Sequence, residues 1–273
     1  MNPAAYGLLS SLIYGVGDFL SGMASRRDSP LRVAALTHPL SALALGLLAF
    51  LLHQPLPPAS DLWWGVAGGL VGLGAILAFY RALALGPMGA VSVSAGALSA
   101  AVPVAIGIIG GETLGLNGWL GALAVLIGTA MLSLHPGERG GNGVTIGILA
   151  GIGFGFFFTL LGQAHSAQGI LWTLAVARLA SALVILPIAA KMVGLRPQAP
   201  ALVFGSAPFD MAGNLLYLLA VQGGGLAIGA LLSSLYPAFT TLLAVVVLRE
   251  RLKPMQWVGV VIAMIGAVLL SAK

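Results

Sequence analysis

The sequence predicts an all-α integral membrane protein whose ten transmembrane helices form two inverted five-helix repeats. Composition, the length of the apolar runs and an internal duplication carry this prediction. Of the 273 residues, 59% are hydrophobic and only 7% are charged, whereas about a quarter of the residues in a soluble domain are charged. So little polar surface cannot cover a water-soluble body.

Apolar runs between glycines, prolines and charged clusters define the spans, each near the ~20 residues that cross a bilayer. They are predicted at 4–23, 32–52, 62–84, 89–110, 117–134, 144–163, 169–192, 200–221, 226–247 and 255–271. The runs are too long for barrel strands and lack a period of two. The first run has no basic leader and contains Asp18, so we expect a span and not a cleaved signal peptide.

The duplication divides the chain into halves predicted at 1–137 and 138–273. The segment 234–271, two apolar runs around the hinge RERLKP, repeats a pattern at 98–132. The aligned pairs in this part are Glu112 with Glu250, Trp119 with Trp257, Gly121 with Gly259 and Gly128 with Gly266. Earlier in each half, an offset of 140 aligns Ser41-Ala42-Leu43 with Ser181-Ala182-Leu183 and His38 with Arg178. Because five is odd, the second half enters the membrane from the opposite side, an architecture typical of transporters.

Several motifs, in this order, resemble the EamA-type branch of the drug/metabolite transporter superfamily. They are FYRALALGP (79–87), GGETL (110–114), SSLYPAFTTLLAVVVLRERL (233–252) and the QWVG that follows. The resemblance covers almost the whole chain. It implies a secondary transporter of metabolites or drugs with a central cavity between the halves, and it favours efflux without indicating a substrate.

The basic residues predict the orientation. Loops after the odd-numbered spans carry Arg26, Arg27, Arg32, Arg139, Lys191, Arg196, Arg249, Arg251 and Lys253, with Arg81 toward the same side. The opposite side has only Lys273. The positive-inside rule therefore predicts a cytoplasmic basic side and termini outside, whereas the family resemblance favours termini inside. We expect a prokaryotic cytoplasmic (inner) membrane, and the scattered charges argue against nucleic-acid binding.

Ionisable side chains within the spans are the first candidates for function, because each costs ~3 kcal/mol or more at the bilayer centre unless paired or hydrated. The candidates for proton or cation coupling are Asp18, Asp210 and His38. Burial favours the neutral form of a carboxyl group, so Asp18 can exchange a proton or bind a cationic substrate. The alternative is a structural ion pair with Arg81 or Arg178. Arg81 lies near a span end, where snorkelling to the interface explains it.

Candidates for substrate binding come from both halves. They are Tyr14, Tyr80, Gln163, Arg178, Asn214, Tyr217 and Tyr236. His38 and Arg178 would face one another across the two-fold axis and bind a carboxylate or phosphate; alternatively, Arg178 neutralises Asp210 and His38 bonds a backbone carbonyl. Asp210, Asn214 and Tyr217 share one face of their span, which polar bonding between helices would equally explain.

Other features receive structural interpretations beside functional ones. Pro103 and Pro237 fall midway in their spans, where a proline frees a carbonyl for a ligand or simply kinks the helix. Glu112 and Glu250 are predicted to cap the next helix. The five tryptophans stand near span ends, where they anchor the protein at the interface.

The sequence argues against several classes of chemistry. With no cysteine, disulfides, iron–sulfur clusters and thiolate metal sites are excluded. No metal-ligand spacing, phosphate loop or nucleophile–base arrangement occurs, so we expect no metal, no cofactor and no enzyme, a membrane-embedded enzyme being the weaker alternative. The expected partners are a small-molecule substrate, membrane lipid and protons, with monomer or dimer left open. Proton coupling through Asp18 is the first hypothesis, and an uncoupled uniporter or exchanger is the alternative.

Overall fold

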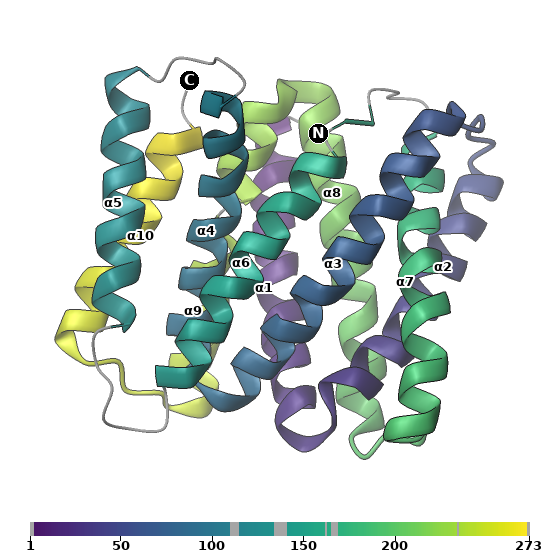
Figure 1. Ribbon diagram of the computed structural model, residues 1–273, viewed down its shortest axis with the longest axis horizontal. Helices are drawn as coiled ribbons and strands as arrows, with labels where there is room; N and C mark the ends of the chain where they lie inside the picture. Colours follow the sequence, from purple (N-terminus) through teal and green to yellow (C-terminus); the bar gives the residue numbers. More distant parts are fainter. Residues whose placement is uncertain are drawn as a thin grey trace.

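The computed structural model describes residues 3–109, 115–133, 141–161, 163–164, 169–233 and 235–271. All regular elements in this part of the chain are α-helices. They are α1 (Pro3–Arg27), α2 (Pro30–Leu51), α3 (Ala59–Leu85), α4 (Met88–Ile109), α5 (Leu116–Ser133), α6 (Gly141–Leu161), α7 (Ile170–Met192), α8 (Pro200–Ser233), α9 (Tyr236–Leu248) and α10 (Pro254–Ser271). The start of α1 and the end of α10 lie at the same edge (Figure 1), as an even number of traversals requires.

Five helices in the described residues are long and apolar enough to cross a membrane. They are α1, α2, α3, α6 and α7. Shorter apolar stretches occur in α4, α5, α9 and α10. The all-helical class is confirmed, and the count of ten spans stays a prediction.

Proline marks the beginning of several helices. Pro30, Pro200 and Pro254 are the first residues of α2, α8 and α10, and Pro237 lies in the first turn of α9. A proline there sacrifices no hydrogen bond, because the first amides of a helix have no intrahelical acceptor. After α7, Gly194 adopts a φ of 71°, the left-handed conformation that commonly ends a helix.

The predicted boundary between the eighth and ninth spans is wrong. The sequence placed it at the glycine run 223–225, but α8 continues through this run to Ser233, and the chain turns just before Tyr236 and Pro237. Each glycine costs a helix only about 1 kcal/mol and keeps its amide donor, whereas proline lacks that donor and is best tolerated in the first turn of a helix. Pro237 therefore begins α9 and does not lie midway in a span.

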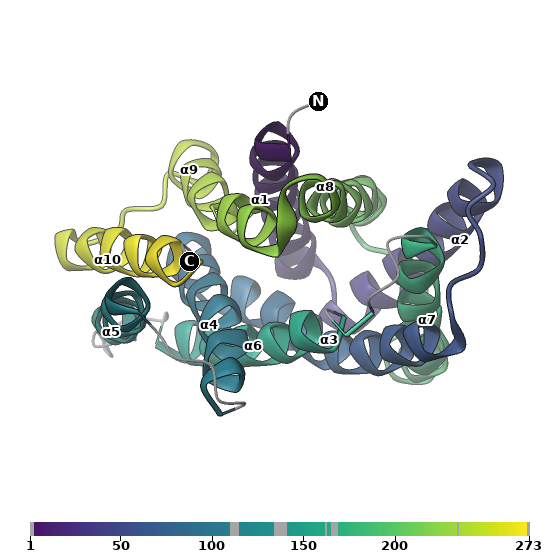
Figure 2. The same ribbon diagram turned by 90° about the horizontal axis from the view of Figure 1, so that it is seen from above.

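Viewed from above, the helices form two layers with a helix pair at each end (Figure 2). The layer α9–α1–α8 faces the layer α4–α6–α3, while α5 pairs with α10 and α2 pairs with α7. When the repeats are aligned, α1, α8 and α9 correspond to α6, α3 and α4. Each layer thus contains helices of both halves, and the two layers are equivalent, which is the arrangement that a two-fold relation between the halves produces.

Contacts between α5 and α10 show the same reciprocity. A Cβ added to Gly128 would lie 2.7 Å from the carbonyl oxygen of Gly259, and one added to Gly266 would lie 2.8 Å from that of Gly121. The aligned pairs are Gly121 with Gly259 and Gly128 with Gly266, so each contact is the repeat of the other. Glycine is required here because the two backbones approach too closely for a side chain.

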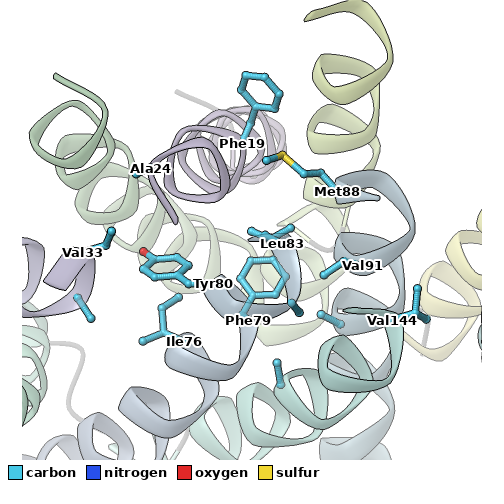
Figure 3. Packing of buried hydrophobic residues seen from close by; sticks show 14 of the residues in the cluster. Phe19, Ala24, Val33, Ile76, Phe79, Tyr80, Leu83, Met88, Val91 and Val144 are labelled. Atoms are coloured by element: carbon cyan, nitrogen blue, oxygen red, sulfur yellow. The ribbon is translucent and has the colours of Figure 1, made fainter. Parts of the chain in front are cut away.

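Burial also repeats between the halves. Leu43 and Leu183 are 73% and 68% exposed, whereas the aligned Ser41 and Ser181 are 2% and 1% exposed. Leucines that face outward beside serines that face inward are expected of a protein whose outer surface meets lipid. Aromatic and aliphatic side chains of α3 and α4 fill the core beside α1, as Figure 3 shows for Phe79 and its neighbours.

Candidate functional site

An ion pair between two helices of the second half lies at mid-helix depth. Arg178, on α7, places its Nη2 2.7 Å from Oδ2 and 2.8 Å from Oδ1 of Asp210, on α8. The two side chains are 16% and 25% exposed, so water can reach them in part. This pair realises the structural alternative for Arg178, because its charge is compensated within the protein. Binding of a substrate carboxylate or phosphate by Arg178 stays a prediction.

His38, on α2, contacts the same arginine. Its Nε2 lies 3.3 Å from Nη1 of Arg178. The two residues that the offset of 140 aligns are therefore in direct contact. A guanidinium only donates hydrogen bonds, so Nε2 must accept, and the ring is neutral with its proton on Nδ1. Within the described part of the chain, Nδ1 is buried without a partner, and the predicted bond to a backbone carbonyl is absent.

The packing of α7 on α3 fixes the position of Arg178. A Cβ on Gly69 would lie 2.7 Å from the carbonyl carbon of Ala177, the residue before Arg178. The hydroxyl of Ser181 donates to the carbonyl oxygen of Gly69 at 2.7 Å. Because the two backbones touch, α7 cannot slide without breaking these contacts.

Asp18 is half-buried near the middle of α1 and has no ionic partner. Within the described residues it forms neither a salt bridge nor a hydrogen bond. The pairing with Arg81 or Arg178 is therefore wrong, since Arg178 binds Asp210. Asp18 lies close enough to Asp210 for two ionised carboxylates to repel one another. An ionised Asp18 would therefore carry a negative charge that no described side chain compensates.

Two tyrosines from opposite halves stand near Asp18. The ring centroids of Tyr14, on α1, and Tyr236, on α9, are 6.2 Å apart with a tilt of 60°. Both side chains lie within electrostatic reach of Asp18. The structure thus gathers three of the predicted residues at the junction of α1, α8 and α9.

The remaining candidates surround this group from α3 and α8. Tyr80 is 4% exposed and lies within electrostatic reach of Asp18 and Asp210. Asn214 donates from Nδ2 to the backbone oxygen of Asp210 at 2.8 Å, which holds the acidic residue in place. Tyr217 packs its ring 5.9 Å from that of Phe158 and joins α8 to α6.

A polar stripe along α1 is a feature that the sequence interpretation missed. Ser11, Tyr14, Asp18, Ser21 and Ser25 are spaced three or four residues apart and therefore lie on one face of the helix. The three serines are almost completely buried, and the hydroxyl of Ser25 has no partner among the described residues. The heptad spacing of polar residues in an apolar helix was the signal that would have revealed it.

Glu250 caps a helix, but not the one predicted. Its carboxylate accepts hydrogen bonds from the amides of Met88 at 3.0 Å and Gly89 at 3.4 Å, at the start of α4 in the other half. Arg26 pairs with Glu250 at 3.0 Å and donates to the carbonyl oxygens of Leu83 and Gly86. We call these residues the Arg26–Glu250 cluster; it ties the halves together at the basic end.

A second set of contacts at the basic end has a counterpart at the opposite end. Arg32, bonded to Asp28, donates from Nε to the carbonyl oxygen of Gly194 at 2.9 Å. At the other end, Nε1 of Trp172 donates to the carbonyl oxygen of Gln54 at 3.0 Å. An offset of 140 aligns residue 32 with 172 and residue 54 with 194, so the two bonds are repeats. Trp172 thus does more than anchor the protein at the interface.

Some predicted residues lie elsewhere. Gln163 follows the end of α6 with an exposed side chain, away from the mid-helix groups. Pro103 belongs to α4, but its side chain lies outside the part that the structure describes. Glu112 and Arg139 also fall outside the described residues. Among those described, no group of three His, Asp or Glu side chains gathers in a way that could hold a metal ion.

Comparison with known proteins places the chain in a family. The sequence matches the EamA-like transporter family over residues 1–134 and 141–272. The chain belongs to the EamA-like transporter family. This EamA-like protein is therefore a multi-pass integral membrane protein of the drug/metabolite transporter superfamily, and the resemblance seen in its motifs is confirmed.

A comparison with solved structures finds the fold of this chain in another protein. A solved structure described as "Crystal structure of protein" is similar to this EamA-like chain with a TM-score of 0.62. It is 18% identical in sequence, and the match covers 98% of this chain and 96% of that chain. At this identity the likeness concerns the fold alone. No curated protein matches the sequence.

Proposed function

We propose that this EamA-like protein is a secondary transporter that moves a small organic solute by alternating access and exchanges it for a proton on Asp18. The observation that carries the proposal is the uncompensated carboxylate of Asp18 at mid-helix depth beside the Arg178–Asp210 pair. A lone carboxylate in a membrane interior is costly unless it binds a proton or another cation. Such a group is suited to couple a proton gradient to solute movement.

The proposal includes ten spans in two inverted halves. The equivalence of the layers α9–α1–α8 and α4–α6–α3 supports it, as does the meeting of the aligned residues His38 and Arg178. Inverted repeats allow the two halves to exchange conformations, so that a central site faces each side in turn. We assign the basic end to the cytoplasm by the positive-inside rule. A reporter fused to the C-terminus tests this orientation, and a cytoplasmic signal would contradict it.

The basic end is tied in this structure. The Arg26–Glu250 cluster joins the end of α1 and the start of α4 to the connection between α9 and α10. Charge-assisted hydrogen bonds of this kind contribute about 1.5–3 kcal/mol each. In the alternating cycle, these bonds would break when the site opens toward the basic side and form again when it closes.

The test has two stages. A growth screen of an overexpressing strain against toxic amino acids, their analogues and cationic drugs first identifies the solute. Uptake of this solute into proteoliposomes is then measured under an imposed pH gradient, with a trapped pH-sensitive dye to report proton movement. We expect Asp18→Asn to abolish solute-dependent proton movement and Asp61→Asn to leave it unchanged, because Asp61 lies in the first turn of α3.

The outcome also decides against the alternative of an uncoupled uniporter or exchanger. If solute moves equally well with and without the pH gradient, and Asp18→Asn transports like the unmodified protein, coupling through Asp18 is refuted. Export, and placement in a prokaryotic inner membrane, are parts of the proposal that the direction of flux and cell fractionation would test.

A further inference from the structure

The charges of the described interior leave a single requirement for any solute that binds there. Arg178 and Asp210 neutralise one another, and His38 is neutral because it accepts a bond from Arg178. Within the part of the chain that the structure describes, Asp18 is left without an ion pair. Removing a lone charge from water is unfavourable, so a solute that binds beside an ionised Asp18 restores neutrality only if it brings one positive charge.

The tyrosines beside Asp18 are held rigidly. A Cβ on Gly213 would lie 2.7 Å from the ring of Tyr14, and one on Gly96 would lie 3.1 Å from the hydroxyl of Tyr236. Each ring therefore lies directly on the backbone of a neighbouring helix, and the two rings are tilted toward one another at 6.2 Å. Rings fixed in this way need little ordering when a ligand binds, which favours affinity.

From this arrangement we propose that Asp18, Tyr14 and Tyr236 form a binding site for a monovalent organic ammonium ion. The ammonium group would pair with the carboxylate of Asp18 while its substituents contact the two rings, because aromatic faces attract cations. The proposal rests on the proposed transport function and adds the chemical class of the solute.

Other classes of ligand fit this site less well. An anion would face the uncompensated charge of Asp18 without an arginine to receive it, since Arg178 is bound to Asp210. A divalent metal ion requires about six oxygen ligands, and no cluster of acidic or histidine side chains suited to a metal occurs among the described residues. An uncharged solute would leave the carboxylate uncompensated.

The site also explains how exchange would work. A protonated Asp18 is neutral and no longer attracts a cation, so proton and ammonium ion compete for one carboxylate. We expect binding of the cation to weaken as the pH falls, by about tenfold per unit once Asp18 is mostly protonated. Competition of this kind yields obligatory exchange without any further coupling group.

Calorimetric titration of the purified full-length protein in detergent tests the proposal. The probes are phenethylammonium, uncharged phenethyl alcohol and anionic phenylacetate, which share a ring and a chain of equal length. We expect phenethylammonium to bind most tightly at the highest pH tested, about pH 8, because ionisation of Asp18 is most favoured there, and we expect the other two probes to show no heat. Asp18→Asn should weaken binding at least ~10-fold, as loss of a charged partner does, and Asp61→Asn should not.

Two variants of Tyr14 distinguish attraction of the cation by the aromatic ring from a hydrogen bond to the hydroxyl group. Tyr14→Phe should keep the affinity, and Tyr14→Leu should weaken it about 3- to 10-fold, the range of a single cation–ring contact. If a variant does not fold, the pH dependence of the unmodified protein still tests the claim. The proposal is overturned if the alcohol binds as tightly as the cation, if no cation binds up to ~10 mM, or if affinity is independent of pH.

The two proposals can fail separately. Proton movement that depends on Asp18, with the solute from the screen, together with no binding of phenethylammonium, would refute the ammonium site and leave proton-coupled transport standing. Binding of phenethylammonium without any solute-dependent proton movement would refute coupled transport.

Discussion

Replacing Gly69 by alanine tests whether the contact of α3 with α7 positions the Arg178–Asp210 pair. The added Cβ would lie 2.7 Å from the carbonyl carbon of Ala177, where ordinary contacts begin at 3.4 Å. The atom in the way belongs to backbone, so no rotamer change relieves the overlap, and the helices must separate by at least ~0.7 Å. Overpacking of this size costs about 1–3 kcal/mol.

The higher helix propensity of alanine partly offsets this cost, so a control variant must measure the propensity gain alone. Alanine stabilises a helix interior over glycine by about 0.5–1 kcal/mol, so the net loss of stability expected for Gly69→Ala is about 0–2.5 kcal/mol. Gly74 lies on the same helix with nothing within 4 Å of an added Cβ. Gly74→Ala therefore receives the propensity gain alone and should be neutral or stabilising.

The assay is thermal unfolding in detergent, followed by circular dichroism and by the folded fraction on size exclusion. We expect a lower Tm for Gly69→Ala than for the unmodified protein, and an equal or higher Tm for Gly74→Ala. Because Ala177 precedes Arg178, the displacement should also disturb the Arg178–Asp210 pair. Transport per folded molecule should therefore fall for Gly69→Ala and not for Gly74→Ala. An equal Tm for the two variants would refute the packing argument.

Two further predictions concern the ends of the molecule. Glu250→Ala removes charge-assisted bonds worth about 1.5–3 kcal/mol each and should loosen the basic end. In a protein that carries Ser25→Cys as the reporter, an impermeant maleimide added from the basic side should then label the cysteine at least ~10-fold faster. Arg251→Ala in the same background should leave the labelling rate unchanged. Trp172→Phe removes the bond to Gln54 and should cost about 0.5–1.5 kcal/mol of stability, whereas Trp257→Phe, which is exposed, should cost less. Equal effects within either pair would contradict the assignment.

The helices and their repeat could be predicted because the membrane imposes them on the sequence. Each span needs a continuous apolar run, and runs of this kind are visible in composition alone. The offset of 140 also brought His38 and Arg178 to equivalent places, and the structure brings them into contact at 3.3 Å. The proximity of these two residues could be predicted from the repeat symmetry alone, without knowing how the helices pack.

The partners of individual charges could not be predicted in the same way. Arg178 had Asp18 and Asp210 within its possible reach, and the choice depends on how α1, α7 and α8 pack. Glu250 was expected to cap the helix that follows it, yet it caps α4 because the fold brings the start of that helix to it. Spacing along one helix can be read from sequence, whereas contacts between distant helices depend on tertiary packing.

The reciprocal contacts indicate which helices can stay fixed if the protein transports by alternating access. The bond from Arg32 to Gly194 and its repeat from Trp172 to Gln54 are both formed in one structure. If the halves exchange conformations during transport, each of these bonds takes the geometry that the other has now. Both bonds can therefore stay formed throughout. The pair α2–α7, like α5–α10, can therefore stay fixed while the layers that carry Asp18 and Tyr236 rearrange around it. If so, Arg178 belongs to the fixed pair α2–α7, which is consistent with the proposal that the solute binds at Asp18, the carboxylate without an ion pair among the described residues.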